Sequence, residues 1–176
     1  MGKVFNLLLR ASIFYFLLEV MLFPEDPRFA GKAIPIRNLI IVTSLSLLFP
    51  ILYFLKKKWK SYPYWLDNLY LSLFWLDMAG NSFNLYDSFR FFDLIPHFHG
   101  TGAIAAVFYG AFSLPFLSAL GLANIIHLLL EAQEYYTDVF FGTHNVGGIA
   151  DTINDLMVGV LGTAVYLWFY RLLKRR

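Results

Sequence analysis

The sequence predicts an all-α protein, a polytopic transmembrane helix bundle with about six spans. Hydrophobic residues make up 59% of the chain and charged residues only 15%, whereas a soluble domain has about 45–50% and about 25%. The apolar residues also fall into runs that approach the roughly 20 residues needed to cross a bilayer. Aromatic residues, which are included in that hydrophobic share, make up 19% of the chain, which suits lipid-facing and interfacial positions.

Each predicted span is bounded by polar or turn-forming residues. A charged, proline-containing loop at 24–37 follows the first span, and the lysine run 56–60 ends the second. A tight turn at 110–115 and a glycine-rich loop at 142–148 separate the last three. The 176 residues form one transmembrane domain, with spans expected at 4–23, 38–55, 65–86, 94–112, 115–140 and 149–173.

An even number of spans places both termini on the same side of the membrane. Lys3, Arg10 and the basic runs 56–60 and 171–176 all fall on that side. Basic residues beside spans mark the cytoplasmic face. We therefore expect both termini to be cytoplasmic.

Composition also excludes several function classes. The chain has no cysteine, so disulfides and thiolate metal sites are absent. A net charge of +2 is too small to indicate nucleic-acid binding. No metalloprotease, serine-hydrolase, phosphate-loop or dinucleotide motif occurs.

Polar residues recur at helical spacing in four of the predicted spans. Because consecutive spans run in opposite directions, all four sets should meet at one depth, near the outer face. Ionisable residues within spans are costly and indicate function. The sets are Asp77, Asn81 and Asn84; Asp93 and His97; His127, Glu131, Glu134 and Asp138; and Asp151 and Asp155.

So many carboxylates cannot all be charged and unpaired in a low dielectric, so either some are protonated or cations neutralise them. The few basic residues expected nearby, chiefly Arg90, cannot balance them, whereas a divalent metal ion would. We expect His97, Glu131 and Glu134 to be catalytic. The predicted metal ligands are Asp93, His97, Glu131, Glu134, Asp151 and Asp155, and the other pocket residues are Asp77, Asn81, Asn84, His127 and Asp138.

Plainer interpretations remain for some of these residues. Asp87, Asp93, Asp138 and Asp151 could simply lie at helix ends, where carboxylates are favourable near an N-terminus. His99 and His144 are expected at the interface or in a loop, and His127 could be a structural, hydrogen-bonded histidine. Glu131 and Glu134 are hardest to explain this way, because both lie on one face of an apolar helix.

Three segments resemble the YjdF-type family of bacterial membrane proteins. They are Phe92-Asp93 with His97-Phe98, Glu131 with Glu134-Tyr135, and Gly142-Thr143 followed by Asp151-Thr152, Asp155 and Gly159 to Gly162. A weaker likeness to VanZ-like proteins exists in the Asp and His-Phe pattern. Tyr135 replaces a common tryptophan, and the loop 143–150 differs. The resemblance implies an integral protein of a bacterial or archaeal plasma (inner) membrane, but it supplies no activity.

Three hypotheses for function remain open. The first is a metal-dependent, membrane-embedded hydrolase or transferase that acts on a lipid or lipid-linked substrate. The second is a small cation or proton-coupled transporter, which should carry acids through to the inner half. The third is a structural or partner-binding membrane protein. Membrane lipids are the expected partners, and a homo-oligomer is left open.

Overall fold

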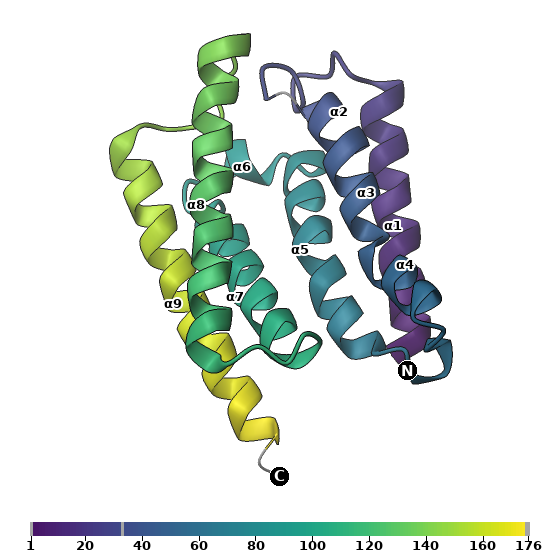
Figure 1. Ribbon diagram of the computed structural model, residues 1–176. Helices are drawn as coiled ribbons and strands as arrows, with labels where there is room; N and C mark the ends of the chain where they lie inside the picture. The colour runs from purple at the N-terminus through teal and green to yellow at the C-terminus, as the bar shows by residue number, and fades with distance from the viewer. Residues whose placement is uncertain (1, 33, 175–176) are drawn as a thin grey trace.

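The computed structural model describes residues 2–32 and 34–174, and within these ranges it contains helices and no strand. The predicted all-α bundle is confirmed (Figure 1). The α-helices are α1 (Gly2–Leu22), α2 (Ile34–Arg37), α3 (Thr43–Ser46), α4 (Leu48–Leu55), α5 (Tyr64–Ser82), α6 (Leu85–Ser88), α7 (Leu94–Gly110), α8 (Phe116–Phe141) and α9 (Ile149–Lys174). A π-helix, η1 (Asn38–Val42), and a 3-10 helix, η2 (Trp59–Ser61), complete the set.

In the described part of the chain, four helical runs are long and apolar enough to cross a membrane, so the chain is an integral membrane protein. They are Gly2–Leu22, Asn38–Leu55, Phe116–Phe141 and Ile149–Lys174. In each of them only 22–28% of the most apolar window is buried inside the protein. Many of their other apolar side chains are exposed, among them Leu7, Phe54, Leu117 and Met157, as expected of helices that face lipid.

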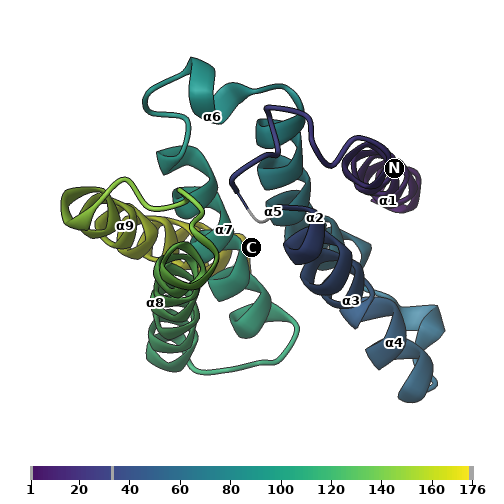
Figure 2. The ribbon, with the colours of Figure 1, turned by 90° about the horizontal axis from the view of Figure 1, so that it is seen from above.

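The other two predicted spans form α5 and α7, which are less apolar or shorter than those four. Figure 2 shows both in the middle of the bundle, flanked by the remaining long helices. Because inner helices contact protein rather than lipid, they tolerate polar side chains. Accordingly, α5 buries Asp67, Asn68 and Asn81.

The bundle consists of two halves joined where α5 packs against α7. In the first half, α1 and α3 pack on α5, around a core that includes Ile13, Phe16, Phe49, Leu71 and Met78. In the second half, α7, α8 and α9 pack on one another. Its core is made of small residues with one leucine, namely Ala105, Ala119, Ala123 and Leu167.

Small residues bring α7 and α9 into close contact. A Cβ at Gly162 would overlap the backbone carbonyl of Phe98, and one at Gly102 would overlap the Tyr166 ring. Such small-residue contacts are typical of membrane helix pairs, because they let backbones approach closely. The packing fixes the depth of α9 against α7, and thereby the relative positions of their polar residues.

The second predicted span is a broken helix that begins earlier than expected, at Ile34 rather than at residue 38. Its second turn has π geometry, since the Thr43 N–H bonds to the Asn38 carbonyl. A π-turn inserts an extra residue into the helix and often marks a functional site. The earlier start places Arg37 inside the bundle instead of in a loop.

The third predicted span, 65–86, is shorter than expected because α5 ends at Ser82. Asn84 then adopts a left-handed conformation, with φ of 55°, which turns the chain into α6. The start of α1 and the end of α9 lie at the same end of the bundle (Figure 1). The polar residues that line the cavity between the two halves lie toward the opposite end.

Candidate functional site

A cavity of about 580 Å³ lies between the two halves of the bundle. Its volume falls in the usual range of small-molecule sites. One part is polar and is lined by Arg37, Asp77, His97, His127 and Glu134, among others. The other part is lined by the apolar side chains Ile41, Val42, Leu73, Phe74, Ile104 and Ala123, while Leu130 lies between His127 and Glu134 on α8.

Three potential metal-ligand atoms converge at the polar part of this cavity. Nδ1 of His97 lies 2.8 Å from Nε2 of His127. Oε1 of Glu131 lies 3.4 Å from the first of these nitrogens and 3.3 Å from the second. Ligands at about 2.0–2.1 Å from a tetrahedral metal ion are about 3.3 Å apart, so this triangle has the size of a metal-coordination face.

The surroundings of the triangle leave polar atoms without partners. The side chains of His127 and Glu131 are buried, with 4% and 5% of the residue exposed. Among the described residues, neither Nδ1 of His127 nor Oε1 of Glu131 has a hydrogen-bond partner. Buried polar atoms are normally hydrogen-bonded. An ion at the triangle would satisfy Oε1 of Glu131, whereas Nδ1 of His127 points away from the triangle, toward Gly159 of α9.

A second group of potential ligands shares His97. Oδ1 of Asp93 lies 3.4 Å from Nε2 of His97, and a carboxylate oxygen of Asp155 approaches the same two residues. Asp155 is buried, with 3% exposed, and its Oδ1 has no hydrogen-bond partner among the described residues. A carboxylate on the far nitrogen of a metal-binding histidine typically orients the imidazole ring.

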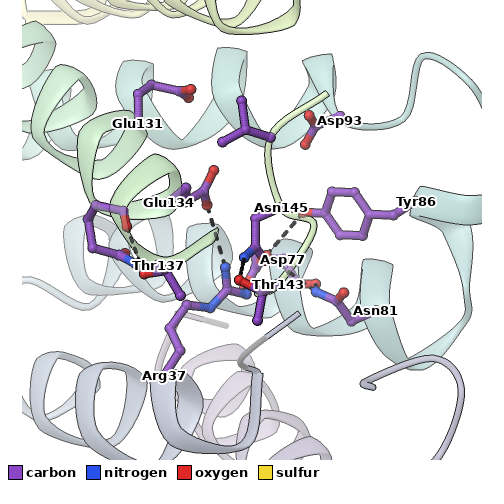
Figure 3. A network of polar contacts seen from close by, with 12 residues as sticks. Arg37, Asp77, Asn81, Tyr86, Asp93, Glu131, Glu134, Thr137, Thr143 and Asn145 are labelled. Atoms are coloured by element: carbon purple, nitrogen blue, oxygen red, sulfur yellow. Dashed lines mark hydrogen bonds and ion pairs between the residues drawn. The ribbon is translucent and has the colours of Figure 1, made fainter. Parts of the chain in front are cut away.

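Arg37 supplies the positive charge of the site. Its Nη2 donates a hydrogen bond of 2.8 Å to Oδ2 of Asp77, and its Nη1 lies 3.6 Å from Oε1 of Glu134 (Figure 3). The hydroxyl of Tyr86 donates to the other oxygen of Asp77 at 3.0 Å. The expectation that Arg90 is the chief nearby cation is corrected: Arg90 lines the cavity, but its guanidinium lies over the Phe91 ring.

The sequence reasoning missed Arg37 because it placed this residue in a loop. One signal could have found it. Proline is tolerated in the first turn of a helix, and Pro35 occupies that turn of α2. A helix that begins there carries Arg37 toward the acidic residues rather than into solvent.

The loop 142–148 forms a rim over the polar part, through His144, Asn145, Val146 and Gly147. Asp138 holds this loop by accepting hydrogen bonds from the Thr143 hydroxyl at 2.6 Å and from the backbone N–H groups of Asn145 and Val146. Asp151 accepts one from the Gly147 N–H at 3.0 Å. These contacts engage Asp138 and Asp151 in the rim, and neither belongs to the two ligand groups.

The remaining predicted residues are spread around the site. Asn81 donates to the Asp77 carbonyl at 3.0 Å, Glu134 pairs with Arg37, and Asn84 forms the turn after α5. Asp87, considered as a helix end, pairs with Lys32 at 2.9 Å. His99, expected at the interface or in a loop, instead contacts the Ser72 hydroxyl at 2.8 Å and the Tyr166 hydroxyl at 2.6 Å, joining α5, α7 and α9.

A separate polar network lies at the other end of α5, near the start of α1. The Asp67 carboxylate is fully buried, with 0% exposed. Its Oδ2 accepts hydrogen bonds from Arg10 at 2.7 Å, Asn6 at 2.7 Å and the Tyr62 hydroxyl at 2.5 Å. The carboxylate is thus paired and hydrogen-bonded, and none of these residues lines the cavity.

No family model, curated protein or solved structure matches the chain. The likeness to YjdF-type and VanZ-like proteins therefore stays a prediction from short motifs. Function has to be argued from the geometry of the cavity.

Proposed function

We propose that the protein is a membrane-embedded, metal-dependent enzyme that acts on a lipid or lipid-linked substrate. The observation that carries the proposal is the triangle formed by Nδ1 of His97, Nε2 of His127 and Oε1 of Glu131. Its edges of 2.8–3.4 Å and the buried Oε1 of Glu131, which has no hydrogen-bond partner among the described residues, suit a divalent ion such as Zn²⁺. Two histidines with one carboxylate form a common catalytic metal set.

The shape of the cavity supports a lipid as substrate. A polar part with charged residues continues into a part lined by aliphatic and aromatic side chains, such as Ile41 and Leu73. A membrane lipid has the same division into a polar head and an apolar chain. The polar part would hold the head group beside His97 and Glu131, while the apolar part would hold the chain.

The roles of the surrounding residues follow from their positions. A divalent ion held by His97, His127 and Glu131 would activate water at neutral pH and polarise an ester oxygen. Asp93 would orient the His97 imidazole through its far nitrogen. Glu134 lines the cavity one helical turn beyond Glu131, where its carboxylate can take a proton from the attacking water.

We further propose that both termini face the cytoplasm and that the cavity opens toward the outer half of a bacterial or archaeal plasma membrane. The lysine run 56–60 and the end of α9 lie at the same end of the bundle as the start of α1 (Figure 1). Positive charge of this kind marks the cytoplasmic side. The polar part of the cavity lies toward the other end.

Metal binding is the direct test. The purified protein in detergent, stripped with a chelator and then titrated with Zn²⁺ or Mn²⁺, is expected to bind one ion per chain. Glu131→Gln should weaken binding by more than about 100-fold, since even outer-shell changes cost 10–100-fold. Glu25→Gln is the matched control, because Glu25 is an exposed loop residue.

The activity is tested with the metal-loaded protein in liposomes of bacterial polar lipids. Head-group release, followed by mass spectrometry, is expected for the wild type and should be lost in Glu134→Gln. Absence of bound metal in the wild type, or equal metal binding by Glu131→Gln, contradicts the proposal.

The two other hypotheses make different predictions. A cation or proton-coupled transporter would produce flux in sealed liposomes under an ion or proton gradient. Asp67 is an acid toward the other end of the bundle, but its Oδ2 accepts hydrogen bonds from Arg10, Asn6 and Tyr62 and it does not line the cavity, which argues against a through-path. A structural protein would show neither metal binding nor flux, and size analysis in detergent would report whether it forms a homo-oligomer.

A further inference from the structure

Arg37 forms an ion pair, but most of its N–H donors make no hydrogen bond to the described residues. Within the described residues its guanidinium makes one hydrogen bond, from Nη2 to Asp77, while the approach of Nη1 to Glu134 is 3.6 Å, too long for a hydrogen bond. The side chain is 21% exposed and lines the cavity. A guanidinium has five N–H donors, so most of its donors are available to a ligand.

The free N–H donors of Arg37 lie near both the polar part and the apolar part of the cavity. Glu134 lies three residues from Glu131 on α8, which is about 4.5 Å along the helix axis. Arg37 therefore faces the polar part about one helical turn from the His97–His127–Glu131 triangle. Ile41 and Val42, which come four and five residues after Arg37 in the chain, line the apolar part.

We propose that Arg37 binds the anionic head group of the substrate, a lipid phosphate, and that Glu134 occupies this place when no lipid is bound. Planar guanidinium groups bind phosphate oxygens with two parallel hydrogen bonds. The Asp77 hydrogen bond holds one edge of Arg37 and leaves the edge that faces Glu134 for the ligand. The proposal rests on the proposed function only in taking the cavity as the substrate site.

The proposal makes a different prediction for each of three side chains. Glu134 competes with the anion for Arg37, so removal of its charge should strengthen anion binding. Removal of the Arg37 charge should weaken it. Lys32 also lines the cavity, but its ammonium is 2.9 Å from Oδ2 of Asp87, so its loss should matter little.

The test uses the purified full chain in a non-ionic detergent with a chelator present, and intact-complex mass spectrometry. Three probes are titrated: dihexanoyl phosphatidic acid, dihexanoylglycerol with the same chains and no phosphate, and inorganic phosphate with no chain. We expect phosphatidic acid to bind one per chain, about tenfold or more tighter than either other probe, because dihexanoylglycerol lacks the charged hydrogen bond and inorganic phosphate lacks the apolar chains.

The variants then assign the effect to Arg37. R37Q should reduce phosphatidic acid binding to the level of dihexanoylglycerol, and E134Q should tighten it several-fold, while K32Q stays within about twofold of wild type. R37K, which keeps the charge paired with Asp77, covers the case that R37Q does not fold. It should bind more weakly than the wild type because an ammonium lacks the planar fork.

Two results overturn the proposal. One is phosphatidic acid binding that is equal in the wild type, R37K and E134Q. The other is inorganic phosphate binding as tightly as phosphatidic acid, which would make this a site for a free anion. Because the titration needs no metal, a chain that binds phosphatidic acid through Arg37 but binds no metal refutes the proposed function alone.

Discussion

Nδ1 of His97 and Nε2 of His127 lie 2.8 Å apart, although thirty residues separate them in the sequence. Helices α7 and α8 bring the two rings together, and α9 covers the pair from behind through Gly159. Two facing imidazole nitrogens hold either one shared proton or a cation. The residues that pack behind the rings are therefore as important to the site as the rings themselves.

Gly159→Ala is expected to impair metal binding without changing a ligand. A Cβ at this position would overlap Nδ1 of His127 and lie 3.0 Å from Oγ1 of Thr101, so the imidazole must turn. Metal affinity should fall about 10–100-fold, as for other changes around metal ligands, and stability by about 1–3 kcal/mol. Zinc titration and thermal unfolding measure the two effects.

Gly121→Ala is the control for this change. Nothing lies within 4 Å of a Cβ there, and Gly121 lies within α8. Replacement should leave metal affinity unchanged and add up to about 1 kcal/mol of helix stability. Equal affinities in both variants would contradict the role given to Gly159.

Asp67→Ala should destabilise the bundle without touching the cavity. Arg10 would lose its carboxylate partner at 2.7 Å. Removal of one partner of a buried ion pair costs about 3–5 kcal/mol, and the partial exposure of Arg10 points to the lower end. Unfolding in denaturant reports the change, and zinc binding should stay at the wild-type level.

The double variant Arg10→Met with Asp67→Leu separates charge from packing. It removes both charges and leaves apolar groups, which is often neutral for buried pairs, so most of the lost stability should return. A double variant less stable than Asp67→Ala would show that the network contributes more than the pairing of one charge.

Asp138→Ala should release the rim of the cavity. The loop loses hydrogen bonds from Thr143, Asn145 and Val146 to this carboxylate. The backbone N–H groups of Asn145 and Val146 should exchange with deuterium at least about tenfold faster, since one such bond to a charged group is worth about 1.5–3 kcal/mol. Asp87→Ala, an exposed pair with Lys32, should leave exchange in this loop unchanged.

Because of the loop between α1 and α2, the stability of the protein should vary with pH in the acidic range. Hydrogen bonds from the Arg28 side chain and backbone lower the pKa of Asp26 from 3.8 to about 2. A carboxyl group whose pKa is lower in the folded state stabilises the protein at pH values above its unfolded-state pKa. This stabilisation is lost as the pH falls from about 4 through about 2. The thermal unfolding temperature of Asp26→Asn should therefore approach that of the wild type over this interval. A constant difference between the two profiles from pH 5 to pH 2 would contradict the assignment.

Much of the fold could be predicted because lipid-facing helices must be apolar along their length. The spans at 4–23, 115–140 and 149–173 agree closely with α1, α8 and α9. The broken second span could not be predicted in this way. Its π-turn, and the turn at Asn84 that ends the third span early, depend on contacts with other helices rather than on local composition.

The candidate site shows a similar division. Alternating helix directions predict His97, Glu131 and Asp155 at one depth, and in the structure His97 lies close to each of the other two, with His127 beside Glu131. The pairing of Arg37 with Glu134 was not predictable, because it joins two segments whose approach depends on how the halves of the bundle pack. The space that Gly159 leaves for the His127 ring likewise exists only in the folded protein.

The π-turn after Arg37 sets the rotation of that side chain relative to the rest of the second span. Deletion of one residue from Asn38–Val42 would restore regular α-helical pitch and turn everything before it by about 100°. The composition of the cavity would be unchanged, yet Arg37 would leave both Asp77 and Glu134. A single-codon deletion at this turn could therefore disconnect the arginine from the site in one evolutionary step, and a single-codon insertion could restore it.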